Sequence, residues 1–269
     1  MLNANGFNAY SYKSILQPLG FNTIALDMRG HGMSNLPIDI HNLKNWNIFR
    51  DDIIEFFDRY IKNPVVLAGH SYGAVSGILA MPEIKNKVTG FVGFDPVLLP
   101  WPARLFSHFS WFREIAKQKL PVAKHAGRRK YKFESFEAAF DRYKKRGVFK
   151  DFTNDALKNY LIGGLVYDDE GVKLSCNPLW EQAIYAAQAH NVFNSIKYLP
   201  QKNSDIIFAG RGGSVSYQSG RNAFERKLGK NSVSFNLELD HMFPFNNPDF
   251  AISRLQEALS KSALNSQAL

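Results

Sequence analysis

One pentapeptide of this chain has the spacing of a reactive serine. Residues 69–73 read Gly-His-Ser-Tyr-Gly, directly after the apolar run 64–69 and directly before the helix-forming run 74–81. A serine on a tight turn from strand to helix has close backbone neighbours two positions to either side, which is why glycines are needed there. Such a turn exposes the hydroxyl of Ser71 and aims the helix N-terminus at the reacting centre. The predicted chemistry is nucleophilic attack by Ser71.

A serine hydroxyl at its ordinary pKa needs a base, and His241 is the best placed candidate. It follows the predicted last strand, within the segment Leu-Glu-Leu-Asp-His-Met-Phe-Pro-Phe. The other histidines lie in the pentapeptide itself, in predicted turns and loops, or in and beside the middle segment of the chain: His31, His41, His70, His108, His125 and His190. We therefore expect His241 to take the proton of Ser71.

The elements that position these residues alternate along most of the chain. Short apolar, β-rich runs predict strands at residues 23–27, 64–69, 88–94, 206–209 and 233–239. Apolar positions at three- and four-residue steps predict helices at 42–60, 218–228 and 248–264. This alternation is typical of an α/β fold with a doubly wound, mostly parallel sheet.

The middle segment breaks that alternation. Residues 99–177 have helical patterns but no clear strand, so we expect an all-helical cap inserted after the strand that follows the pentapeptide. Residues 1–98 and 178–269 would then form the core. The cap begins with an apolar stretch, and four of its rings are predicted to line a substrate pocket above Ser71: Trp101, Phe106, Phe109 and Trp111.

The net charge of +9 is confined to this middle segment. Residues 101–165 hold fifteen Lys and Arg against six acids, and the rest of the chain is balanced. A basic surface of this kind suits an anionic or lipid-like substrate, and contact with a membrane surface is a second use of it. A solvated helical face is the plainer interpretation. No nucleic-acid-binding module accompanies the charge, so nucleic acid is not an expected partner.

Several motifs together resemble the α/β-hydrolase superfamily. The pentapeptide, the turn Asp-Met-Arg-Gly-His-Gly-Met-Ser at 27–34 and the segment Asp-His-Met-Phe-Pro-Phe at 240–245 match the family's pattern in order and spacing. Residues 3–7 resemble the loop whose backbone holds the oxyanion. The resemblance implies a capped serine hydrolase, esterase-like, without cofactor or metal, with an oxyanion hole made by the N–H groups of Asn5 and Tyr72.

The acid of the triad departs from the family's common pattern. The turn after the penultimate strand usually carries it, but residues 210–214 read Gly-Arg-Gly-Gly-Ser. Some lipases and dehalogenases of this fold place it after the strand that follows the nucleophile, where this chain has Asp95. We expect Asp95 to orient His241, with other carboxylates as alternatives: Asp240, Asp27, Asp168 and Asp169. An aspartate introduced at Gly213 is expected to reach the same histidine.

The beginning of the chain also departs from the family. The oxyanion loop starts at residue 3, so either translation starts upstream or the protein is short with an exposed sheet edge. The single cysteine, Cys176, cannot form an intramolecular disulfide, and no stretch of about 18 apolar residues occurs. These features predict a cytoplasmic protein.

The sequence thus predicts a cofactor-independent serine hydrolase. Its substrate would be a carboxylic ester, a thioester or a related acyl compound, cleaved through an acyl-enzyme. Two alternatives remain open at this point. One is a carbon–carbon bond hydrolase of the same fold, and the other is a catalytically silent member that binds a ligand or partner.

Overall fold

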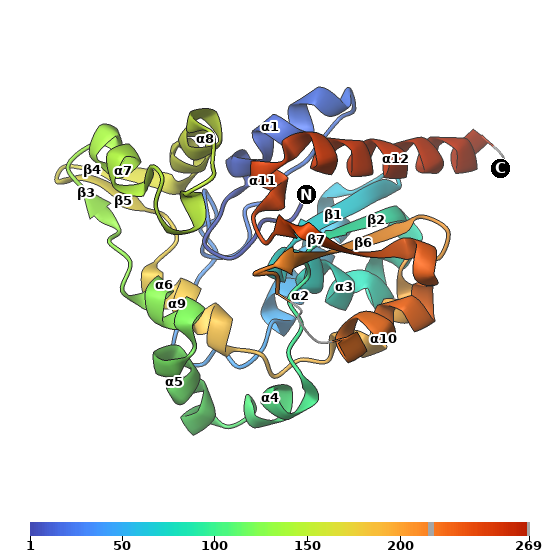
Figure 1. The fold of residues 1–269 in the computed structure, drawn as a ribbon, viewed down its shortest axis with the longest axis horizontal. Helices are drawn as coiled ribbons and strands as arrows, with labels where there is room; N and C mark the ends of the chain where they lie inside the picture. Colours follow the sequence, from blue (N-terminus) through green and yellow to red (C-terminus); the bar gives the residue numbers. More distant parts are fainter. Residues whose placement is uncertain (215–217, 268–269) are drawn as a thin grey trace.

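A four-stranded parallel sheet forms the centre of the molecule (Figure 1). The computed structural model describes residues 1–214 and 218–267. In spatial order the strands are β1 (Val65–His70), β2 (Val88–Phe94), β6 (Ser204–Arg211) and β7 (Val233–Asp240). All three neighbouring pairs are parallel, so the carboxyl ends of the four strands meet at one edge. The strands predicted at 64–69, 88–94, 206–209 and 233–239 are confirmed.

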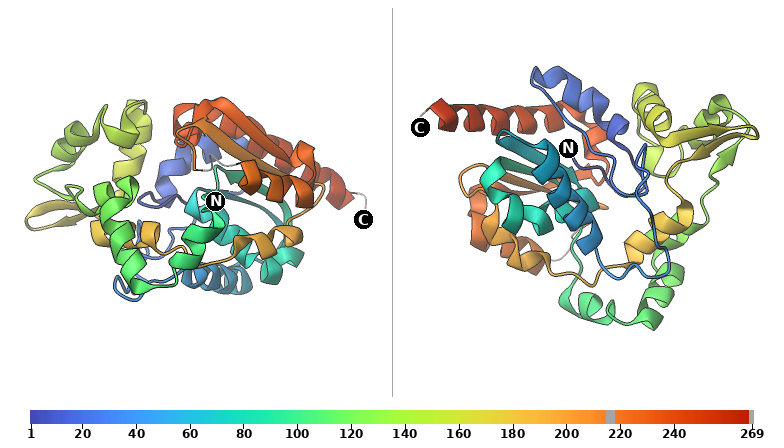
Figure 2. Two further views of the ribbon diagram at one scale, coloured as in Figure 1. Left: turned by 60° about the horizontal axis from the view of Figure 1, so that its bottom comes forward. Right: turned by 180° about the vertical axis from the view of Figure 1, so that it is seen from behind.

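Helices cover both faces of this sheet (Figures 1 and 2). One face carries α2 (Asn47–Tyr60), α3 (Tyr72–Ile84) and α10 (Gln218–Leu228); the other carries α1 (Lys13–Leu16), α11 (Phe243–Asn246) and α12 (Pro248–Gln267). The fold is therefore a doubly wound, parallel α/β sheet, as the alternation of elements predicted. In the described part of the chain, no helix combines the length and the apolar composition that crossing a bilayer requires.

Alternate residues of the strands fill two apolar layers. Leu67 and Phe91 pack with the buried stripe of α2, whereas their neighbours Ala68 and Val92 belong to the layer under α12. Successive side chains of a strand point to opposite faces, and a sheet covered on both sides must therefore be apolar throughout. The continuous apolar runs that predicted these strands have this cause.

A second lobe lies between β2 and β6. Its elements are α4 (Trp101–Phe106), α5 (Ser110–Lys119), α6 (Pro121–Gly127), β3 (Lys132–Phe133), α7 (Phe136–Tyr143), α8 (Asn154–Gly164), β4 (Leu165–Asp168), β5 (Gly171–Leu174) and α9 (Pro178–Ala186). The prediction of an all-helical segment is wrong, because β3, β5 and β4 form an antiparallel sheet. β4 and β5 pair as a hairpin in which Val172 and Leu174 of β5 are buried and alternate with Lys173, and Gly171, with φ 131°, begins the second strand.

The lobe is packed onto the core through aromatic rings. Phe7 stacks on Phe245 with ring centroids 5.0 Å apart and meets the edge of Tyr160, from α8, at 5.2 Å. Helix α9 also contacts both the second lobe and the core. Trp46 of the core donates its indole N–H to Ile184 O at 3.0 Å. The boundary expected between residues 177 and 178 thus falls at the start of a helix that contacts both parts.

The prediction of a strand at residues 23–27 is wrong. Leu2 forms single parallel bridges with Gly69 on one side and Leu26 on the other. Beyond Leu2, a cavity of about 390 Å³ separates residues 23–26 from residues 64–68. A β-strand requires backbone hydrogen bonds to a neighbouring strand. Residues 23–25 do not form a strand, because the backbone beside them in the described part of the chain is short: the Met1 amino group donates to Ile24 O at 2.7 Å, and the Leu26 N–H donates to Met1 O at 3.0 Å.

Candidate active site

Ser71 lies on a strained turn between β1 and α3. Its backbone angles are φ 57° and ψ −121°, a conformation that non-glycine residues rarely adopt. A Cβ atom on Gly69 would lie 2.6 Å from the α3 backbone, and one on Gly73 would overlap the carbonyl oxygen of Asn3. The two glycines therefore have the steric role that their spacing predicted.

The structure brings Ser71, His241 and Asp95 into one hydrogen-bonded chain. Ser71 Oγ lies 3.0 Å from His241 Nε2, and His241 Nδ1 lies 2.5 Å from Asp95 Oδ2. An ionised carboxylate can only accept hydrogen bonds, so Nδ1 carries the ring proton and Nε2 is left to accept from Ser71. The three residues follow β1, β7 and β2, whose carboxyl ends share one edge of the sheet.

Asp95 is fully buried, yet its surroundings favour the charged form. Burial by itself raises the pKa of this carboxyl group, but the hydrogen bond and positive field of His241, with the N–H groups of Ala209 and Ser214, outweigh it. The pKa of Asp95 therefore lies below the ordinary value of an aspartate. Asp95 also has φ 42°, a left-handed conformation held by its own N–H donating to Ile207 O at 2.7 Å.

The turn after β6 contributes a hydroxyl and an N–H group to this site. Ser214 Oγ lies 3.0 Å from His241 Nδ1, and the Ser214 N–H donates to Asp95 at 2.9 Å. The signal for it lies in the Gly-Arg-Gly-Gly-Ser turn, whose position in the family's pattern indicates a group that contacts the histidine even where it is not a carboxylate. A Cβ atom on Gly213 would overlap Ala209 O. The expectation that an aspartate at Gly213 could replace Asp95 is therefore wrong.

The alternative carboxylates serve other purposes. Asp240 accepts from the N–H two residues later at 2.9 Å, and Asp27 accepts from the N–H groups of Ala9 and Met33. Asp168 pairs with a lysine of β5 at 2.9 Å, and Asp169 is exposed in the hairpin turn. Among the described residues, Asp95 alone of these five places its carboxylate on His241.

Neither of the two predicted oxyanion donors has a hydrogen-bond acceptor among the described residues. Ala4, Gly6 and Phe7 each donate their N–H to another acceptor, and the described residues offer none to the N–H of Asn5 between them. Tyr72 is the first residue of α3, so its N–H is among those that no helical carbonyl can accept. The N–H groups of Asn5 and Tyr72 thus have no partner in the described part of the chain, which the predicted oxyanion hole requires.

A buried chain of hydrogen bonds ties this loop to the backbone of His241. The Ala4 N–H donates to Tyr12 Oη at 2.9 Å, Tyr12 donates to His70 Nδ1 at 2.9 Å, and His70 Nε2–H donates to the His241 carbonyl at 2.8 Å. Burial and the neighbouring His241 lower the pKa of His70 to about 3, so its ring is neutral and both nitrogens keep these roles. His70 and Tyr12 are positioning residues that sequence reasoning missed.

His31 positions the oxyanion loop from the other side. Its Nδ1–H donates to Arg29 O at 3.1 Å, and its Nε2 accepts the Gly6 N–H at 3.0 Å. Burial lowers its pKa to about 4, which keeps the ring neutral. The ring also stacks on Tyr72 with centroids 5.6 Å apart. The turn at residues 27–34 therefore helps to hold both predicted oxyanion donors.

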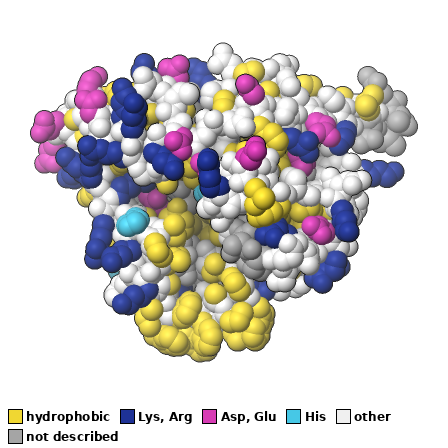
Figure 3. Space-filling model, in the orientation of Figure 1, with side chains coloured by type: hydrophobic (Ala, Val, Ile, Leu, Met, Phe, Trp, Pro, Cys, Tyr) yellow, Lys and Arg dark blue, Asp and Glu magenta, His cyan; other side chains and the backbone are white. Residues whose placement is uncertain are grey.

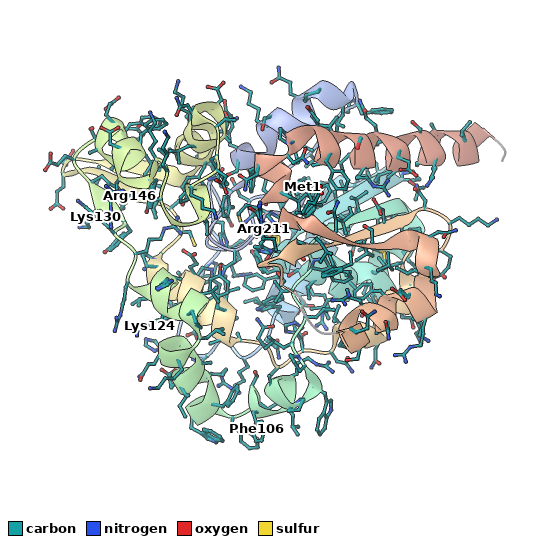
Figure 4. The ribbon with its side chains drawn as sticks, in the orientation of Figure 1. Met1, Phe106, Lys124, Lys130, Arg146 and Arg211 are labelled. Carbon is teal, nitrogen blue, oxygen red and sulfur yellow. The ribbon has the colours of Figure 1, made fainter. Side chains whose placement is uncertain are left out.

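The four rings predicted to line a pocket above Ser71 lie at the surface instead. Trp101, Phe106, Phe109 and Trp111 are 65, 44, 50 and 55% exposed, and Phe106 points away from the body of the molecule (Figure 4). Helix α4 has no buried residue, and the buried residue of α5 is Arg113, so neither helix has an apolar inward face that would hold these rings. The four aromatic rings therefore remain exposed to solvent.

The basic segment is not uniformly solvated. Arg129 forms a buried ion pair with Glu181 at 2.6 Å and donates to the hydroxyl of Tyr160. Glu181 lies against the oxyanion loop, since a Cβ atom on Gly6 would come within 2.6 Å of its carboxylate. Arg129 is therefore committed to the protein and is not free to bind an anionic substrate.

Comparison with known proteins agrees with this geometry. The model of the serine aminopeptidase S33 family matches residues 10–231. The chain belongs to this family. It is a hydrolase with the α/β-hydrolase fold, as the motifs implied.

Solved structures similar to this S33-family chain are also hydrolases. An E-2-(acetamidomethylene)succinate hydrolase aligns with a TM-score of 0.73 at 17% identity over 96% of this chain and 89% of the other. An esterase from Mycobacterium tuberculosis aligns with a TM-score of 0.70 at 18% identity over 96% of this chain and 83% of the other. By sequence, 2-(acetamidomethylene)succinate hydrolase from Mesorhizobium japonicum is 33% identical over 75 residues, which is 28% of this chain and 26% of that protein. The match thus spans about a quarter of that relative.

Removing the hydroxyl of Tyr12 should slow hydrolysis without weakening substrate binding. Tyr12→Phe leaves the Ala4 N–H and His70 Nδ1 without their partner, at a cost of about 1–3 kcal/mol in unfolding free energy. We expect kcat to fall and KM to stay close to the wild-type value. Tyr10→Phe is the matched control, because Tyr10 is 38% exposed. Equal kcat values for the two variants would contradict the positioning role.

The buried histidines should make the fold sensitive to mild acid. The pKa values of His31, His70 and His190 are lowered to about 4, 3 and 3, so the unfolded chain binds more protons below pH 6.5. Stability then falls as the pH drops, by about 2 kcal/mol per histidine at pH 5. Urea unfolding at pH 7 and 5 measures this loss. His190→Gln should reduce it and the exposed His41→Gln should not; equal stability at both pH values would refute the assignment.

Proposed function

We propose that this chain is a cofactor-independent serine hydrolase that cleaves a carboxylic ester, a thioester or a related acyl compound through an acyl-enzyme. The observation that carries the proposal is the continuous chain from Ser71 through His241 to Asp95, at 3.0 and 2.5 Å. Nucleophile, base and orienting acid stand in the geometry that acyl transfer requires. Membership of the S33 family supports the same reaction class.

Acylation follows from the proton positions. His241 Nε2 takes the proton of Ser71 as Oγ attacks the substrate carbonyl, and Asp95 stabilises the imidazolium through Nδ1–H. The carbonyl oxygen becomes an oxyanion, which the N–H groups of Asn5 and Tyr72 can hold. Losing one such donor costs about 10²–10³ in turnover in enzymes of this kind. When the tetrahedral intermediate collapses, His241 returns its proton to the leaving group.

Deacylation repeats these steps with water. His241 removes a proton from the water that attacks the acyl-enzyme, and returns it to Ser71 Oγ as the acid is released. The His241 side chain is 25% exposed, whereas Ser71 is almost completely buried, so solvent reaches the base more readily than the nucleophile.

The main argument for the catalytically silent alternative does not apply to this site. That argument is the absence of a carboxylate in the turn at Gly213. Asp95 supplies a carboxylate to His241, and Ser214 occupies the turn where that carboxylate was first sought. The loop at residues 3–7 is also in place, tied down by Tyr12 and His31.

The relatives suggest where to look for the substrate. The similar proteins include hydrolases of (acetamidomethylene)succinate and of N-formylmaleamic acid, together with esterases. We propose to test carboxylate-bearing acyl compounds beside p-nitrophenyl esters of graded chain length. Because Arg129 is paired with Glu181, a preference for carboxylates would have to come from other groups.

Ser71→Ala and His241→Ala should each abolish hydrolysis to a similar extent, about 10⁴-fold or more, and the double variant should be no slower. Nucleophile and base act as one unit, so their losses do not add. Steady-state kinetics on the ester panel measures this. Ser76→Ala is the control, since its buried hydroxyl on the same helix has no hydrogen-bond partner among the described residues. A double variant markedly slower than either single one would refute the shared role.

Asp95→Asn should lower kcat by about 10⁴-fold while the fold persists, because the amide stabilises the wrong tautomer of His241. Gly213→Asp should not restore the rate in that background, since its side chain would overlap Ala209 O. Asp240→Asn is the matched control beside the same histidine. Full activity in Asp95→Asn, or an equal loss in Asp240→Asn, would show that the acid is misassigned.

A further inference from the structure

The outer end of the second lobe carries a cluster of exposed apolar side chains, which we call the apolar tip. It lies on α4, α5 and the turn between them, and each member is 44–65% exposed: Trp101, Leu105, Phe106, Phe109, Trp111 and Ile115. Figure 3 shows it as a continuous apolar area at the lower edge of the molecule. The rings contact one another, with the centroids of Phe109 and Trp111 6.1 Å apart.

The tip is held outward by a buried charge. Arg113 of α5 is only 8% exposed and donates to Ser107 O at 2.9 Å and His108 O at 3.0 Å. These bonds fix the turn that presents Phe106 and Phe109. The usual arrangement of a surface helix is thus inverted, because the cation lies inside and the rings lie outside. Exposed apolar patches of this kind mark interaction surfaces.

The surroundings of the tip are strongly basic. Residues 101–130 contain eight Lys and Arg and a single Glu. Four of the eight are exposed on the part of the chain that follows the tip: Lys119, Lys124, Arg128 and Lys130. Figures 3 and 4 show Lys and Arg side chains, Lys124 among them, beside the apolar area on the same face.

We propose that the apolar tip docks this protein on an anionic membrane surface. Trp and Phe rings favour the boundary between headgroups and acyl chains, and Lys and Arg beside them attract anionic lipids. A second copy of the chain is the less favourable occupant, since a symmetric contact through the tip would bring the two basic segments together. A membrane also suits a protruding apolar cluster, because lipids can rearrange around it.

The tryptophans allow a direct test. Two of the four, Trp101 and Trp111, belong to the tip, whereas Trp46 and Trp180 are 1 and 0% exposed. Tryptophan emission therefore reports on the tip. We expect it to shift to shorter wavelength, and to be quenched by brominated acyl chains, on adding vesicles of phosphatidylcholine with one third phosphatidylglycerol. Pure phosphatidylcholine or high salt should weaken binding about tenfold or more.

Variants separate the tip from general charge attraction. Phe106→Ser/Phe109→Ser/Trp111→Ser should reduce co-sedimentation with the anionic vesicles about tenfold or more, with unchanged circular dichroism. Leu237→Ser is the control, because Leu237 is a 73% exposed apolar residue of β7 outside the tip. Lys119→Gln/Lys124→Gln tests the basic contribution and should also weaken binding.

Three outcomes would overturn the proposal. They are no binding of the wild-type protein to anionic vesicles, equal binding by the triple serine variant, and a dimer in vesicle-free solution that the serine variant abolishes. Light scattering after size exclusion detects the last of these. None of the outcomes bears on the triad, because the tip shares no residue with it.

Discussion

The hydrogen bond from His241 to Asp95 is the interaction on which the site depends. It joins the ends of β7 and β2, which are separated in the sheet by β6. It forms because all four strands are parallel and end at one edge, where Ser71 also stands. The turn after β6 adds Ser214 to the same pair. Strand order thus decides which carboxylate can reach the histidine, and the burial of Asp95 makes that carboxylate hard to replace.

The strained turn at Ser71 organises the other half of the site. Its flanking His70 links the oxyanion loop, through Tyr12, to the carbonyl of His241. On the opposite side, His31 holds Gly6 and stacks on Tyr72. Two neutral histidines therefore position groups on either side of the nucleophile. Their low pKa values keep their donor and acceptor roles constant over the physiological pH range.

Much of this arrangement could be predicted from the sequence. The glycines around Ser71 have a steric cause that acts within five residues, and the apolar strands follow from burial on both faces. The strand at 23–27 could not be excluded, because its absence depends on what lies beside it. The sequence of residues 165–174 itself indicates a hairpin, but the helical patterns around it favoured an all-helical segment. The outward direction of Phe106 and Trp111 follows from Arg113 turning inward, which no local pattern indicates.

The central claim is that Ser71 is activated by its neighbours, and labelling with a fluorophosphonate tests this most directly. Folded protein at neutral pH should gain one adduct by intact-mass measurement, and peptide mapping should place it on Ser71. Unfolded protein, and folded His241→Ala, should remain unlabelled over the same time. Absence of an adduct on the folded wild-type protein, or an adduct on another residue, would contradict the account and favour a silent binding protein.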